Sequence, residues 1–154
     1  MKNTLIIGGL GFIGSNLAHA LIKCGHKITI LDAEIDPYGW NHYNIKSITN
    51  KIEYKKIDIR NIDELNDQVK NKDIIFNFAG QVSRIISLEN PQLDIDINIM
   101  GSINLLEAVK NFAPDAKVIF AGSRAQTGEP QYLPVDENHP DNPTDIYGIN
   151  KLTS

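Results

Sequence analysis

Short apolar runs alternate with stretches of helical spacing along most of this 154-residue chain. The apolar runs have the length and the β-branched residues of buried strands. They cover residues 5–7, 27–31, 51–57, 73–78 and 117–121. Helical spacing is found in residues 12–24, in residues 61–70 and in the stretch after Pro91. This alternation predicts an α/β fold in which helices cover both faces of one parallel sheet.

The stretch after Pro91 carries two conflicting patterns. Residues 93–99 alternate between apolar and polar side chains, as a half-buried strand does. Against this, Asn90 and Pro91 fit the N-cap and the first position of a helix, and apolar residues continue at helical spacing to Leu106. We therefore predict one long helix, whose polar residues form a solvated or partner-facing side.

Four glycines fall within seven residues directly after the first apolar run, with the spacing Gly8-x-x-Gly11-x-x-Gly14. Glycine lets the backbone turn tightly and approach a pyrophosphate, which then faces the positive end of the following helix. The alternative is a plain turn with spare glycines. Because a strand precedes the glycines and a helix follows them, we interpret the segment as a dinucleotide-binding loop.

Composition narrows the function classes further. The length fits one domain, and a net charge of −4 argues against a general nucleic-acid binder, which needs a basic face. No apolar run approaches the roughly 18 residues of a membrane span, and the first strand begins too near Met1 for a signal peptide. We expect a cytoplasmic protein without a metal site. The single cysteine, Cys24, is predicted to be a small buried hydrophobe on the first helix.

Two aspartates follow predicted strands. Asp32 lies 18 residues after Gly14, where a carboxylate accepts the ribose hydroxyls of adenosine and repels a 2′-phosphate. No arginine lies near it in the sequence, which favours NAD over NADP; the alternative is an aspartate that caps a turn. Asp58 either meets the adenine or forms a turn before Ile59 and Arg60.

A second candidate cluster lies near the end of the chain. Tyr147 and Lys151 are four residues apart and share a helical face, so the ammonium would favour the phenolate and make the tyrosine a base. Ser123, just past the fifth strand, could hydrogen-bond the same substrate oxygen. A chance surface pair is the default for such spacing, but the glycine turn upstream favours the catalytic interpretation.

Prolines mark a long surface loop before this cluster. Four of the seven prolines lie between Pro130 and Pro143. Loops of this kind carry function in some proteins, but for most of these residues we favour a connector with little regular structure.

Together these residues resemble the extended short-chain dehydrogenase/reductase superfamily, in its NAD-dependent nucleotide-sugar epimerase/dehydratase branch. The residues that carry the resemblance are Gly8 to Gly14, Asp58-Ile59-Arg60, Asn77-Phe78-Ala79-Gly80, Asn98, Gly101 to Ala108, Ser123, and Tyr147 to Lys151. The resemblance implies a Rossmann-type doubly wound sheet, tightly held NAD, a nucleotide-sugar substrate and a homodimer in the complete enzyme. It also implies that Ser123, Tyr147 and Lys151 catalyse hydride transfer at a sugar carbon.

The implied cofactor contacts are distributed along the whole chain. Asp32 and Asp58 carry over to the adenosine positions, and Ala79 and Gly80 to the backbone beside the nicotinamide. The full expected set is Gly8, Gly11, Phe12, Ile13, Gly14, Asp32, Asp58, Ile59, Ala79, Gly80, Tyr147 and Lys151.

Two departures from the family pattern shape the expected function. Arg124 and Ala125 follow Ser123, where the family's 4,6-dehydratases have an Asp-Glu pair, so we favour an epimerase like UDP-glucose 4-epimerase over a dehydratase or reductase. The chain stops at Ser154, whereas family members continue into a substrate domain. We therefore expect residues 1–154 to be an incomplete NAD-binding Rossmann domain, inactive alone. The alternative from another class is a catalytically dead dinucleotide-binding module.

The expected strand order also makes a prediction about this chain in isolation. In the order 3-2-1-4-5-6, the strand in residues 117–121 would pair next with a strand that follows it later in a complete domain. Its apolar residues would then lie on an unprotected edge, and exposed edges pair with other chains. We expect the isolated chain to self-associate or to be marginally stable.

Overall fold

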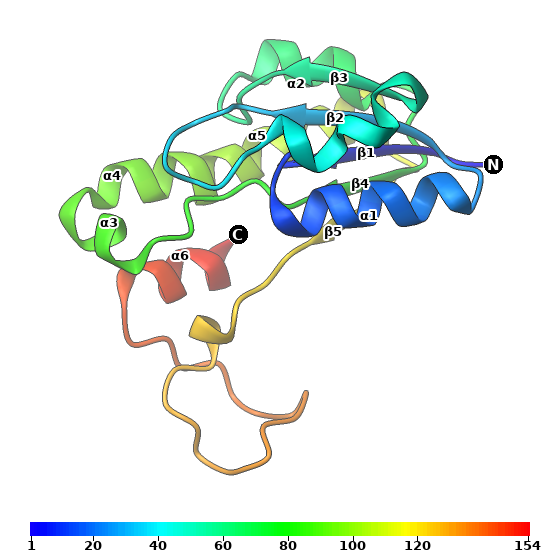
Figure 1. Cartoon of the computed structure of the whole chain (residues 1–154). Helices are drawn as coiled ribbons and strands as arrows, with labels where there is room; N and C mark the ends of the chain where they lie inside the picture. The colour runs from blue at the N-terminus through cyan, green and yellow to red at the C-terminus, as the bar shows by residue number, and fades with distance from the viewer.

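A parallel five-stranded sheet forms the centre of the molecule (Figure 1), in a computed structural model that describes residues 1–154. The strand order is β3-β2-β1-β4-β5, as the sequence predicts. The strands are β1 (Asn3–Ile7), β2 (Lys27–Asp32), β3 (Ile52–Lys56), β4 (Ile74–Asn77) and β5 (Lys117–Phe120). The strand order reverses beside β1, which pairs with β2 on one side and β4 on the other.

Apolar side chains of the sheet separate into two cores, one on each face. Along β1, Leu5 and Ile7 belong to one buried cluster and Ile6 to the other, because successive side chains of a strand point to opposite faces. The first cluster includes residues of α2 (Ile62–Val69) and α5 (Gly101–Phe112). This two-sided burial confirms the doubly wound fold.

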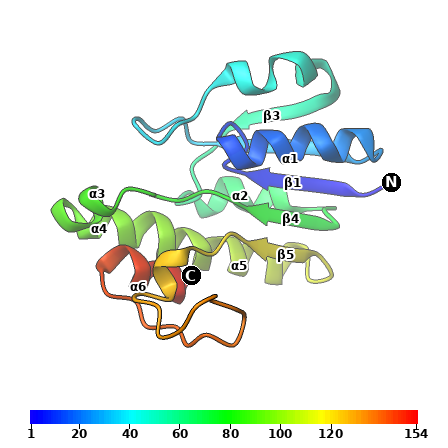
Figure 2. The same ribbon diagram turned by 60° about the horizontal axis from the view of Figure 1, so that its bottom comes forward.

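The opposite face is covered by α1 (Phe12–Lys23) and by a 3-10 helix, His42–Lys51, that the sequence pattern did not predict. Its buried residues, Ile45 and Ile48, are three apart, the spacing of one 3-10 turn. Figure 2 shows α1 on the side of the sheet away from α5.

The predicted long helix is confirmed, with an irregular middle. It runs without a break through α4 (Pro91–Asp94), a π-helical segment (Ile95–Met100) and α5. Asn90 caps it, since the Asn90 side chain accepts a hydrogen bond from the Leu93 amide at 3.2 Å. The prediction that its polar residues face solvent or a partner is wrong for three of them. The side chains of Asp94, Asn98 and Ser102 are buried inside the protein instead.

The prediction of a buried Cys24 is also wrong, because this side chain is exposed. Helix α1 ends at Lys23, and Cys24 is its C-cap. The fully buried residues of α1 are small, namely Gly14, Ser15 and Ala18, while the larger Leu17, Leu21 and Ile22 are partly buried against the same core.

The C-terminal part of the chain places α6 (Ile146–Thr153) beside α3 (Arg84–Glu89) and the π segment. Between the short 3-10 helix Arg124–Gln126 and α6 there is no helix or strand, which confirms the predicted irregular loop. Strand β5 lies at the edge of the sheet, with Ile119 exposed, as predicted. None of the helices combines the length and the apolar character needed to cross a membrane.

Candidate functional site

A cavity of about 460 Å³ opens where the carboxyl ends of the strands meet the N-terminus of α1 and one face of α6. Ligands of open α/β sheets bind at this place, where the strand order reverses. All twelve residues expected to contact the cofactor lie along its wall: Gly8, Gly11, Phe12, Ile13, Gly14, Asp32, Asp58, Ile59, Ala79, Gly80, Tyr147 and Lys151.

Packing explains why two of the turn residues are glycines. Gly8 has a φ of +77°, and a Cβ there would lie 2.7 Å from the backbone nitrogen of Ala79. A Cβ on Gly14 would lie 2.5 Å from the carbonyl oxygen of Gly8. Both contacts are shorter than real Cβ atoms tolerate, so these glycines are required for α1 to start so close to β1 and β4.

Gly11 differs from these two glycines because its surroundings are open. A Cβ there would have the Gly8 oxygen, 3.4 Å away, as its only protein neighbour within 4 Å. Gly11 is also the N-cap of α1, with no side-chain cap and no acidic residue in the first turn. The first amides of α1 therefore present unpaired donors and positive helix-end charge beside the cavity.

Asp32 caps a turn, which is the alternative that the sequence left open, and it also lines the cavity. Its two carboxylate oxygens accept hydrogen bonds of 3.0 Å from the backbone amides of Leu10 and Glu34. Burial raises the pKa of Asp32, and the two backbone hydrogen bonds oppose that rise. The carboxylate is thereby held in one orientation at the end of β2.

Asp58 forms the turn that the sequence allowed as an alternative to a ligand contact, and it also lies on the cavity wall. Its carboxylate accepts hydrogen bonds from the Arg60 amide at 2.9 Å and from the Arg60 guanidinium at 2.6 Å. Burial acts to raise the pKa of Asp58, but these hydrogen bonds from Arg60 hold it below its ordinary value.

Close to Asp32 in the chain, the carboxylate of Glu34 contacts Lys56, His42 and Tyr54. The Glu34 carboxylate lies 2.9 Å from the Lys56 ammonium and 2.7 Å from the His42 ring, and it accepts a hydrogen bond of 2.5 Å from the Tyr54 hydroxyl. The bonds from Lys56 and Tyr54 lower the pKa of Glu34 to about 2. Glu34 is therefore ionised near neutral pH and compensates the positive charge of Lys56.

Tyr147 and Lys151 are brought together with the glycine turn, because both lie on α6 and line the cavity. Burial lowers the pKa of Lys151, and the negative charge of Asp94 opposes this. Ser123 is not among the cavity-lining residues. Its hydroxyl oxygen accepts a hydrogen bond of 3.2 Å from the Ala125 amide and caps the 3-10 helix Arg124–Gln126.

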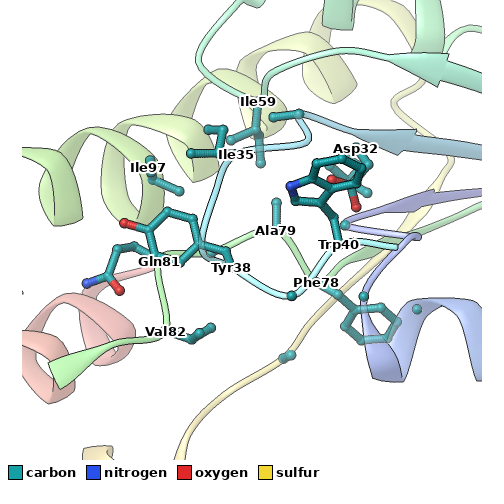
Figure 3. Close-up of a pocket in the computed structure, with 18 of the residues that line it drawn as sticks. Asp32, Ile35, Tyr38, Trp40, Ile59, Phe78, Ala79, Gln81, Val82 and Ile97 are labelled. Carbon is teal, nitrogen blue, oxygen red and sulfur yellow. The ribbon is translucent and has the colours of Figure 1, made fainter. Parts of the chain in front are cut away.

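The loop after β2 forms one wall of the cavity that the sequence pattern did not predict. Tyr38 and Trp40 of this loop line the cavity, and Figure 3 shows both rings among the lining side chains. Trp40 also donates a hydrogen bond of 3.2 Å to Asp36. The signal available was a pair of aromatic residues flanking Gly39, six and eight residues after Asp32.

The sequence of this chain matches one protein family and several named proteins. Residues 5–154 match the family described as GDP-mannose 4,6 dehydratase. A Methanocaldococcus jannaschii protein with a provisional UDP-glucose 4-epimerase name is 41% identical over 96% of this chain and 47% of its own length. UDP-glucose 4-epimerase of Mycolicibacterium smegmatis is 33% identical over 97% of this chain and 48% of its own length.

Solved structures agree with these sequence matches. UDP-N-acetylglucosamine 4-epimerase of Methanobrevibacter ruminantium, in complex with UDP-N-acetylmuramic acid, has a TM-score of 0.89 at 33% identity, covering 99% of this chain and 47% of that one. UDP-glucose 4-epimerase of Stenotrophomonas maltophila, with bound NAD and formylated UDP-arabinopyranose, has a TM-score of 0.89 at 27% identity, covering 99% and 46%.

These matches cover nearly all of this chain but only part of each relative. The chain spans about half the length of the curated relatives named above. Its match to the family covers residues 5–154, which include the glycine turn, the long helix and the Tyr147–Lys151 pair. The chain therefore belongs to the nucleotide-sugar epimerase/dehydratase family of the extended short-chain dehydrogenases/reductases.

Proposed function

We propose that this chain is the NAD-binding part of a nucleotide-sugar epimerase that resembles UDP-glucose 4-epimerase. One observation supports this most strongly: a single cavity is lined by the glycine turn, by Asp32 and by the Tyr147–Lys151 pair. The first two are suited to a dinucleotide, and the third is suited to proton transfer at its reactive end. Similarity to epimerases crystallised with NAD supports the same assignment.

The residues on the cavity wall fit NAD. The uncapped N-terminus of α1 beside Gly11 would hold the pyrophosphate. Asp32 would accept the hydroxyls of the adenosine ribose, with Asp58 and Ile59 beside the adenine. The backbone at Ala79 and Gly80 would line the nicotinamide side. Phe12 and Ile13, both exposed on the first turn of α1, would be covered by the cofactor.

We further propose that the cofactor is NAD and not NADP. A 2′-phosphate on the ribose would meet the Asp32 carboxylate. The cation that could attract it, Lys56, is already paired with Glu34. The local charge therefore opposes the phosphate in two ways, by repulsion at Asp32 and by the neutralisation of Lys56.

In the proposed reaction Tyr147 is the base. It takes the proton of a sugar hydroxyl, and the Lys151 ammonium on the next turn of α6 favours the phenolate form that does so. NAD, when bound, would supply the reversible hydride acceptor for the same carbon. Tyr147 would give the proton back to the oxygen when the hydride returns to the opposite face of that carbon. Ser123 does not line the cavity itself but follows Gly122, which does. Its oxygen accepts from the Ala125 amide, so its hydroxyl proton stays available to a substrate oxygen at that edge of the cavity.

Arg124 and Ala125 after Ser123 favour epimerisation, because neither side chain supplies the acid and base needed for elimination of water. A 4,6-dehydratase or reductase remains the second candidate, since dTDP-glucose 4,6-dehydratase of Bacillus anthracis has a TM-score of 0.84 at 29% identity. A dinucleotide-binding module without catalysis is the third. We expect residues 1–154 alone to bind NAD without turnover.

We also propose that the complete protein is a cytoplasmic homodimer. Apolar side chains remain exposed on two helices near the cavity, Ile103 and Leu106 on α5 and Ile149 and Leu152 on α6. Sedimentation velocity tests this proposal. A dimer that dissociates on replacement of Ile103 and Leu106 by serine is expected, whereas a monomer at all concentrations contradicts it.

The reaction is tested with UDP-glucose deuterated at C4, using the 154-residue chain and, where longer sequence follows it, the longer protein. An epimerase gives UDP-galactose that retains the deuterium, with no net reduction of NAD. A dehydratase gives a 4-keto-6-deoxy sugar, and a reductase consumes NADH. The Tyr147→Phe variant of the active protein is expected to bind NAD and lose about 10²–10⁴-fold in rate.

A further inference from the structure

A buried carboxylate lies behind the proposed catalytic helix. Asp94, at the end of α4, is fully buried, with an exposure of 0%. It has no cation within ion-pair distance and is surrounded by amide donors instead. Buried carboxylates are costly unless their oxygens are fully hydrogen-bonded, so this arrangement needs a physical reason.

Three side-chain amides from three parts of the fold satisfy this carboxylate. Asn98, on the same helix, donates to its Oδ1 at 2.7 Å, and Asn150 of α6 donates to the same oxygen at 2.9 Å. Gln81, from the loop after β4, donates to Oδ2 at 2.9 Å. All three amides are buried, with exposures of 2%, 4% and 0%.

Helix α6 is held mainly by polar contacts. Besides the bond from Asn150, Arg84 pairs with Asp145 at its N-cap. The hydroxyl of Ser154 at its C-cap donates to the Asn98 carbonyl at 3.0 Å.

The helix is eight residues long, too short to be stable in isolation. Its only buried residues are Gly148 and Asn150, whereas its apolar Ile149 and Leu152 are exposed. The hydrophobic burial that normally positions a helix is therefore small here, and polar contacts decide where α6 lies.

The hydrogen bond between Asn150 and Asp94 lies close to the two residues of α6 that line the cavity. Asn150 follows Tyr147 by three residues and precedes Lys151 by one, so its side chain lies on the same side of α6 as Tyr147. Gln81 itself lines the cavity, as Figure 3 shows. Asp94 thus connects the wall of the cavity to the helix that carries the proposed base.

We propose that Asp94 is a positioning residue, which fixes α6 through the buried hydrogen bond from Asn150 and so holds Tyr147 and Lys151 against the cofactor cavity. The importance of this position for catalysis rests on the proposed function. The mechanical part of the proposal does not, since it concerns only how α6 is held.

The negative charge of Asp94 also acts on the ammonium group of Lys151 on α6. Burial lowers the pKa of Lys151, and Asp94 acts in the opposite direction, so the carboxylate helps to keep the ammonium protonated. Other charged groups lie on α6 and on the elements packed against it: Arg84 and Glu89 on α3, Asp96 on the π segment, Arg124 after β5, and Asp145 at the N-cap of α6. Among them, Arg84 is paired with Asp145.

Hydrogen exchange of the α6 amides in the 154-residue chain tests the mechanical proposal without cofactor or substrate. Asn150→Asp places two carboxylates face to face. Asp94→Asn removes the negative charge and leaves one acceptor oxygen for the three amide donors. Each is expected to speed exchange at Ile149 to Lys151 by about tenfold or more. The exchanged pair, Asp94→Asn with Asn150→Asp, restores an amide-to-carboxylate bond and is expected to recover most of the protection.

Asp96→Asn is the matched control, because Asp96 lies two residues further along the same helix and its side chain accepts a hydrogen bond from Gln92, which is not a residue of α6. It should leave α6 exchange unchanged. If Asp94→Asn fails to fold, Asn150→Ala removes the one hydrogen bond between Asp94 and α6. The other two donors of Asp94, Gln81 and Asn98, stay in place. Unchanged α6 exchange in Asn150→Ala or Asn150→Asp overturns the proposal, as does an exchanged pair without recovery.

Titration of the Lys151 side chain by NMR supplies the readout that a purely structural role would not move. The Lys151 pKa is expected to fall in Asp94→Asn and to be unchanged in Asp96→Asn. An unchanged Lys151 pKa in a folded Asp94→Asn variant contradicts the charge effect. Failure of the wild-type chain to bind NAD would instead refute the proposed function and leave the exchange results to decide the role of Asp94.

Discussion

Gly11 and Gly14 give the sharpest prediction, because the structure assigns them different reasons for being glycine. In Gly14→Ala the new Cβ would lie 2.5 Å from the Gly8 oxygen and 2.8 Å from the Gly9 Cα, both backbone atoms that cannot move aside cheaply. Overpacking of this kind costs about 1–3 kcal/mol. With roughly 2–4 °C of Tm per kcal/mol for a domain of this size, Gly14→Ala should lower Tm by several degrees.

In Gly11→Ala the new Cβ meets a single protein atom at 3.4 Å, which is an ordinary contact, and the extended N-cap backbone (φ −71°, ψ 174°) suits alanine. The free energy of unfolding should change by less than about 1 kcal/mol. The methyl group would stand where we place the pyrophosphate, so the Kd for NAD should rise about tenfold or more, equivalent to about 1.4 kcal/mol.

Differential scanning calorimetry and titration calorimetry with NAD separate the two effects. We expect Gly11→Ala to keep the wild-type Tm and lose affinity, and Gly14→Ala to lose Tm. A Gly11→Ala chain that binds NAD as tightly as the wild type would refute the placement of the pyrophosphate at the start of α1.

Three further predictions concern single side chains. Asp32→Ala should raise the Kd for NAD about tenfold or more and reduce the discrimination against NADP, measured by calorimetric titration of both cofactors. Asn61→Ala removes the side chain that accepts from the Glu64 amide at the start of α2, and should cost about 1 kcal/mol of unfolding free energy in urea titrations. The folded pKa of Glu34 is about 2, below its ordinary 4.5, so its stabilising contribution is present above about pH 4.5 and lost as pH falls toward 2. Glu34→Gln should therefore flatten the dependence of Tm on pH in that window, and an unchanged slope would contradict this assignment.

Local sequence signals predicted the framework because each of them has a local physical cause. Apolar runs with β-branched residues mark strands, and the glycine turn between β1 and α1 can be recognised from spacing alone. The cap at Asn90 and the first-position proline likewise fixed the start of the long helix.

Features that depend on tertiary contacts could not be predicted in this way. The burial of Asp94 follows from amides contributed by Gln81 and Asn150, residues 13 and 56 positions away in the chain. The wall formed by Tyr38 and Trp40 depends on how the loop after β2 folds back over the cavity. Cys24 was placed in the core from spacing, although α1 ends one residue earlier.

Calorimetric titration of the purified 154-residue chain with NAD and with NADP tests the central proposal most directly. We predict saturable binding of NAD at one site, with NADP bound about tenfold more weakly or worse, because Asp32 repels the 2′-phosphate and Glu34 neutralises Lys56. A folded chain that binds neither cofactor, or that binds NADP as tightly as NAD, would contradict the assignment of this cavity to NAD.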